Sequence, residues 1–184
     1  PERILPTVLS RCQRVPLQPL SQAELKVHLQ GLGLSGERLE LAVRMGGGSL
    51  DRAKQVAAGA FDEIRERVEQ FLQAGIEAED ESYWELLDEV GARADRGQLE
   101  AFLEVCGLYL RDLLLLAYGR ENRIVGVDRL DFLHRVQPFF QVPQIEAAAI
   151  EVDRAFEYLS RNVNTNLVLV DLWRCLQASA PRRK

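Results

Sequence analysis

Arg11 is the side chain in this sequence whose type and setting point most directly to chemistry. It is the centre of the triplet Ser10-Arg11-Cys12, which follows a short apolar segment and precedes Val15-Pro16-Leu17. A guanidinium group stays charged and presents a planar fork of donors that suits phosphate oxygens. An arginine in such a place is more often a solvated surface charge, so the residue alone does not define a site. The proline predicts extended backbone from residue 14 to residue 20.

A triple glycine, Gly46-Gly47-Gly48, is the second candidate because glycine-rich loops before helices can cradle phosphates. A phosphate loop of the Walker type also needs a Gly-Lys pair followed by Ser or Thr, and the sequence contains none. Ser49 follows the glycines and is a good helix cap. The pattern therefore favours the end of one helix, a tight turn and the start of another.

Other chemistries lack support in the sequence. The three cysteines, Cys12, Cys106 and Cys175, are widely separated, no C-x-x-C occurs, and neither histidine is near them. This spacing predicts no metal site and no disulfide framework, and it is typical of a reducing cytoplasm. No acid/base pair or nucleophile triad stands out, so we expect no enzyme active site, no small-molecule substrate and no cofactor held by this chain.

The charge balance bears on partners. The net charge is −5 and the pI is about 5.2, which argues against a direct grip on DNA, since that needs clustered Lys and Arg. The basic cluster at residues 182–184 is expected to be a solvated terminus. No signal peptide and no membrane-spanning apolar run is present. Because the chain begins at Pro1 and directly in a motif, we expect a piece whose preceding part has been removed.

Helical periodicity from Ser21 onward predicts an all-α fold. Three short helices are expected within residues 20–59, and the first begins with a Ser21-x-x-Glu24 capping box. From residue 60 the helices lengthen, and about five to six are expected, starting near residues 61, 82, 98, 128, 143 and 167. The Asn-rich stretch 162–166 should break one helix and cap the last.

The predicted helix from Gln98 to Tyr118 is apolar on more than one side. Leu108, Leu115 and Leu116 widen its apolar surface beyond a single stripe. A helix of this kind is either central in its domain or covered by a partner. We expect these three leucines to belong to a subunit interface.

Three strings taken together resemble a known family. "LPTVLSRCQ" (residues 5–13), then an extended segment and "PLSQAEL", resemble the end of the ATPase core in clamp-loader subunits of the AAA+ class. "NVNTNLVLVDLWRCL" (residues 162–176) resembles the closing helix of the delta-prime type of bacterial subunit. "LRDLLLLAYG" (residues 110–119) matches in the middle, where otherwise only the helix pattern agrees.

The resemblance implies a domain plan and a role. Residues 1–19 would be the carboxy-terminal edge of an AAA+ core, 20–59 a three-helix lid, and 60–184 a helical collar that joins subunits. The chain would serve the bacterial DNA polymerase III clamp loader, which places the sliding clamp on primed DNA. Arg11 would be a trans arginine finger in a neighbour's ATP site, with Cys12 packing beside it. Partners would be gamma/tau and delta subunits, which bind the ATP and Mg²⁺; DNA contact would be indirect.

Two alternatives stay open. A gamma/tau-type subunit would hydrolyse ATP and would carry a Gly-Ser-x-Arg sensor 2 motif, whose arginine touches nucleotide. Here Asp51 stands where that arginine would be, and Arg52 is one residue late, which turns a helical side chain by about 100°. An unrelated helical scaffold is the other alternative, and it is favoured if Arg11 is buried in a local salt bridge.

Overall fold

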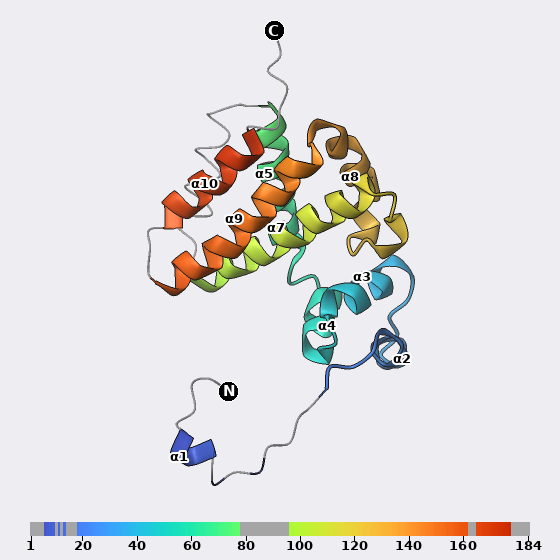
Figure 1. Cartoon of the computed structure of the whole chain (residues 1–184). Coiled ribbons are helices and arrows are strands. Elements are labelled where there is room, and N and C mark those ends of the chain that lie inside the picture. The colour runs from blue at the N-terminus through green and yellow to red at the C-terminus, as the bar shows by residue number, and fades with distance from the viewer. Residues whose placement is uncertain are drawn as a thin grey trace.

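The computed structural model describes residues 6–9, 11, 13, 18–77, 96–161 and 165–177. All regular structure in these ranges is helical, which confirms the predicted all-α class (Figure 1). Ser10 and Cys12, the predicted helix from residue 82, the asparagine turn at 162–164 and the basic tail lie outside the described residues. None of the helices in the described ranges is both long enough and apolar enough to cross a membrane.

The first helical group consists of α2 (Gln22–Gly31), α3 (Gly36–Gly46) and α4 (Leu50–Ala57). The predicted capping box at the start of α2 is confirmed, because Ser21 and Glu24 each accept the backbone N–H of the other. Ser49 caps α4 by accepting the backbone N–H of Arg52 at 3.3 Å. The three helices bury apolar side chains in the hydrophobic core that they share with the longer helices, among them Leu25, Leu29, Leu39, Ala42, Ala53 and Val56.

The longer helices form a bundle: α5 (Asp62–Glu77), α7 (Arg96–Ala117), α8 (Leu130–Val136), α9 (Val142–Ser160) and α10 (Thr165–Gln177). In Figure 1, α7 and α9 run side by side through its centre, and α10 lies against α9. Phe71 packs against both Phe102 and Trp173, with ring centroids 5.6 Å apart in each pair. Aromatic pairs at such separations favour edge or tilted contacts, and this cluster joins α5, α7 and α10.

Two boundaries differ from the sequence prediction. Helix α10 begins at Thr165, so Thr165 and Asn166 belong to the helix that they were expected to precede. Helix α8, expected to start near residue 128, begins at Leu130, and two short 3-10 helices, η2 (Glu121–Arg123) and η3 (Val127–Arg129), lie before it. A third, η4 (Gln137–Phe139), extends α8 past its end at Val136. Single 3-10 turns of this kind often connect helices.

A short helix, α1 (Pro6–Leu9), precedes Arg11. The backbone N–H of Arg11 donates to the carbonyl of Val8 at 3.0 Å, which closes a turn at the helix end. Residues 18–20 are non-helical, in agreement with the extended segment predicted there. The domain boundaries at 19/20 and 59/60 stay predictions.

Candidate functional site

Arg11 is exposed to solvent. Within the described ranges, its guanidinium makes no hydrogen bond or ion pair, and it is therefore not locked into a local salt bridge. Its position directly after α1 leaves the side chain accessible to another molecule. A buried and paired Arg11 would have favoured the scaffold alternative, and the exposed side chain does not provide that support.

The triple glycine is a structural turn, as predicted. Helix α3 ends at Gly46, Gly47 follows in the left-handed conformation with φ 55°, and Gly48 has φ 87°. A Cβ on Gly48 would lie 2.4 Å from the Cβ of Pro19, and the Gly48 carbonyl accepts the backbone N–H of Leu20 at 2.9 Å. Glycine is required here by backbone conformation and by the close approach of the segment that enters α2.

Asp51 and Arg52, at the position of the sensor 2 motif, make contacts that serve the fold of the chain. Asp51 is exposed in the first turn of α4, where a negative charge is favourable near a helix N-terminus. The Arg52 guanidinium donates from Nε to the Met45 carbonyl at 2.9 Å and pairs with Glu104 of α7 at 2.6 Å. It also lies 5.3 Å from the ring centroid of Phe61. Arg52 is therefore held as a link between helices.

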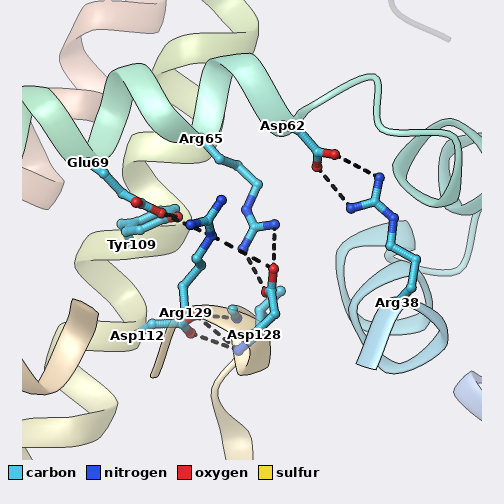
Figure 2. Close-up of polar contacts among 10 residues, drawn as sticks. Arg38, Asp62, Arg65, Glu69, Tyr109, Asp112, Asp128 and Arg129 are labelled. Carbon is cyan, nitrogen blue, oxygen red and sulfur yellow. Dashed lines mark hydrogen bonds and ion pairs between the residues drawn. The ribbon is translucent and has the colours of Figure 1, made fainter. Parts of the chain in front are cut away.

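Arg52 is one of three arginines that cross from the first helical group to the bundle. Arg38 of α3 makes a bidentate pair with Asp62 at the start of α5, with both distances 2.9 Å (Figure 2), and its Nε donates to the Ala57 carbonyl at 3.1 Å. Arg44 donates to the carbonyl of Ile124, beside η2. We call Arg38, Arg44 and Arg52 the junction arginines. They attach one group to three separate elements of the other.

A buried ionic network lies between α5, α7 and η3 (Figure 2). Arg65, with 2% of its side chain exposed, makes a bidentate pair with Asp128 at 2.7 and 3.0 Å. Arg129 Nε lies 3.4 Å from Glu69, which accepts the Tyr109 hydroxyl. A buried charge is tolerated when it is paired and hydrogen-bonded, and this network satisfies that condition.

The pKa directions follow from these contacts. Burial of Asp128 disfavours its charge, but the hydrogen bonds from Arg65 outweigh burial and hold its pKa below the usual 3.8. Burial of Arg65 also opposes charge, and the pairing with Asp128 raises its pKa. Burial and then the bond to Glu69 raise the pKa of Tyr109 above its usual value. The pair Arg65–Asp128 is thus an ionised structural link at neutral pH.

Asp112 fixes the loop that follows α7. The residue is 2% exposed, and its carboxylate accepts the backbone N–H groups of Val125 at 3.0 Å and Gly126 at 2.8 Å. Burial raises the pKa of Asp112 above 3.8, while the two backbone donors act in the opposite direction. Sequence reasoning missed Arg65 and Asp112. Each occupies a position on the apolar face of its helix, where an apolar residue is expected. A charged residue at such a position is the sequence signal that could have identified it as buried and paired.

The three leucines predicted at an interface are all half-buried and touch the core. Leu108 and Leu115 share one face of α7 with Glu104 and Arg111, and Tyr118 in the turn after Ala117 continues it, because these residues follow steps of four and three. Leu116 follows Leu115 by one residue, so its side chain leaves the helix about 100° away. We call the face with the five residues from Glu104 to Tyr118 the outer face of α7. It contains two of the three predicted leucines.

The structure defines an all-α module with one exposed arginine before it and no cluster of His, Cys, Asp or Glu suited to a metal ion in the described ranges. Among curated proteins, the DNA polymerase III subunit delta' of Bacillus subtilis (strain 168) is 23% identical to this chain over 180 residues. The match covers 96% of this chain and 54% of the relative, so the chain spans about half the relative's length. No family model and no solved structure matches.

Proposed function

We propose that this chain is part of a non-catalytic, delta-prime-like subunit of a bacterial DNA polymerase III clamp loader. The observation that carries the proposal is the similarity to a DNA polymerase III subunit delta' along 96% of the chain. Residues 20–59 act as the lid and residues 60–184 as the collar that joins neighbouring subunits. The subunit works in the cytoplasm and meets DNA only through the assembled loader.

Arg11 serves a neighbour's ATP site in this proposal. Its exposure and its freedom from pairing within the described residues support this role. A guanidinium that arrives from outside can neutralise charge developing on a transferred phosphoryl group. The neighbouring gamma/tau-type subunit supplies the ATP and Mg²⁺, and this chain adds only the cation.

The gamma/tau-type alternative is less well supported by the contacts at the sensor position. Asp51 would repel a triphosphate, and Arg52 is engaged by Glu104, Met45 and Phe61. The junction arginines also suit a subunit that stays stiff, since they tie the lid to three elements of the collar.

A reconstitution experiment tests the proposed function. The full-length protein is combined with gamma/tau-type and delta-type subunits, the sliding clamp and primed DNA from the same organism. We expect clamp loading only when the full-length protein is present. Equal loading with and without it would contradict the proposal.

A further inference from the structure

The outer face of α7 ends in an exposed apolar and basic surface. Tyr118 is 61% exposed, and Leu115 beside it is half-buried. The exposed Arg111 lies in the last two turns of α7, and the exposed Arg120 and Arg123 lie in the turn and the 3-10 helix η2 that follow it. The backbone N–H of Arg120 donates to the Leu115 carbonyl at 2.7 Å, which folds the basic turn back against α7. We call these five residues the basic end of α7.

The arginines at this surface outnumber the exposed acid beside them, which is Glu121 between Arg120 and Arg123, 3.5 Å from His134. Neither Arg120 nor Arg123 pairs with an acidic group in the described part of the chain. The nearest acid to Arg111 is Asp112 at 3.6 Å, but Asp112 is buried and already accepts backbone N–H groups. The chain as a whole is acidic, with a net charge of −5, whereas this surface is basic. A basic surface favours a partner that carries negative charge.

A second copy of the same helix would be a poor partner. Its acids Glu100 and Glu104 are engaged within the chain, by Arg96 at 2.8 Å and by Arg52 at 2.6 Å. A symmetric contact centred on Arg111 would oppose like charges. The four- and three-residue spacing of Leu108, Arg111, Leu115 and Tyr118 suits one partner helix lying along α7.

We propose that the basic end of α7 docks an acidic amphipathic helix of a different subunit. This inference rests on the proposed function, since it specifies the chemistry of one collar contact. Apolar side chains of the partner helix pack on Leu115 and Tyr118, and its carboxylates meet Arg111, Arg120 and Arg123. Attraction between exposed opposite charges speeds association and weakens as salt rises.

Charge-reversal variants of the whole chain test the proposal. In the first, Arg111→Glu, Arg120→Glu and Arg123→Glu are combined. The matched control makes the same charge change elsewhere on exposed arginines, with Arg154→Glu, Arg161→Glu and Arg174→Glu. Affinity for purified gamma/tau-type and delta-type subunits is measured at low and at physiological salt. We expect the first variant to lose roughly tenfold or more in affinity for one of them, and its salt dependence to fall. The control should stay close to wild type.

Leu115→Asp adds a test of the apolar part of the surface. Because Leu115 is only half-buried, we expect the melting temperature to change little while affinity for the same subunit falls. In the complex with the wild-type chain, hydrogen exchange of the partner subunit should show a protected segment with acidic and apolar residues at helical spacing. A collapsed melting temperature would place Leu115 in the chain's own core and overturn its docking role.

Four results separate the failures. If the wild-type chain binds neither subunit, the proposed function fails. If it binds and both triple variants bind equally well, only the docking inference is overturned. Light scattering that shows a self-associated chain, dispersed by the first variant, would assign this surface to a second copy. Binding of primed DNA by the chain alone, lost in the first variant, would assign it to nucleic acid.

Discussion

Arg65 carries a charge at a position that is almost fully enclosed, and its partner Asp128 is one-fifth exposed. We predict that Arg65→Met destabilises the chain by about 3 kcal/mol, because it leaves a largely buried carboxylate unpaired. Urea denaturation at pH 7 measures the free energy of unfolding. The control is Arg67→Met, which removes a more exposed pair with Glu63 on the same helix and should cost less than about 0.5 kcal/mol. Equal costs would contradict the importance of the buried pair.

The Arg65–Asp128 pair should also give the stability a specific pH dependence. The pKa of Asp128 is lower in the folded chain than its usual 3.8, so the unfolded chain binds more protons between the two values. The stabilisation is therefore present above about pH 4 and is lost as the pH falls through the folded pKa. We predict that the stability gap between wild type and Arg65→Met narrows below pH 4. Asp112 has a raised pKa of opposite effect, but it is present in both proteins and cancels in the comparison.

A stability gap that stays constant on acidification would show that the effect of Arg65→Met does not depend on the Asp128 charge, and a gap that widens would contradict the prediction as well. Denaturation curves at pH 7, 5 and 3 distinguish these outcomes. Arg65→Lys is the useful companion variant, because it keeps the charge but loses the planar fork. We expect its stability to lie between those of the other two proteins at pH 7.

Arg11 is a residue of the opposite kind, since it is exposed and free of pairing within the described ranges. We predict that Arg11→Ala in the full-length subunit leaves its circular dichroism and melting temperature unchanged. The ATP site that it serves should slow on the order of 10³-fold or more, because a trans arginine stabilises charge in the transition state. Lysine should not rescue it, since a point charge lacks the fork. DNA-stimulated turnover of the reconstituted loader is the readout, and unchanged turnover would remove Arg11 from this role.

At the scale of elements, the junction arginines make the arrangement of α3 and α4 against the bundle depend on ion pairs. Arg38 and Arg52 reach α5 and α7 through charged partners, Asp62 and Glu104. We predict that combining Arg38→Ala with Arg52→Ala loosens this junction while α2, α3 and α4 stay helical, because their buried apolar side chains are unchanged. Hydrogen exchange should then rise at residues 57–61 and 120–125 more than within the helices.

The control for this test is Lys26→Ala, which removes a pair with Glu40 that joins α2 to α3 without crossing the junction. It should leave exchange at residues 57–61 unchanged. If the double variant instead unfolds the first helical group, the group depends on the bundle for its stability, and the junction is part of one core.

The helices were predictable from the sequence because local signals agreed with tertiary packing. The Ser21 capping box, the Gly46–Ser49 turn and the long apolar helix α7 each combine propensity with an apolar pattern. The ionic network was not predictable in this way. Arg65 and Asp128 are far apart in sequence, and only the folded bundle brings their charges together. The start of α10 was missed because asparagine is expected at helix caps, whereas here the helix continues through Asn166.

At the scale of the molecule, the described residues offer no assembled nucleotide site. The triple glycine is used in a turn, Asp51 faces solvent, and Arg52 is paired. We predict that the 184-residue chain does not bind ATP. Isothermal titration calorimetry with ATP and Mg²⁺ should give no saturable heat. Saturable binding in the micromolar range would favour the gamma/tau-type alternative.

The part of the chain after residue 60 contains both the stabilising ionic network and the proposed partner surface. Arg65, Asp112 and Asp128 fix the turn after α7, and that turn carries Arg120 and Arg123. The buried network thereby positions the surface that we assign to a neighbouring subunit. If this surface does join a neighbouring subunit as we propose, residues 119–129 link the stability of the chain to its assembly.

The most direct test of the central claim is the mass of the complex that this chain forms. The 184-residue chain is mixed with gamma/tau-type and delta-type clamp-loader subunits from the same organism and examined by native mass spectrometry. We predict a hetero-oligomer that contains one copy of the chain, formed through the bundle and weakened by the basic-end charge reversals. A chain that stays monomeric, or that associates only with itself, would contradict our proposal that it is part of a clamp-loader subunit.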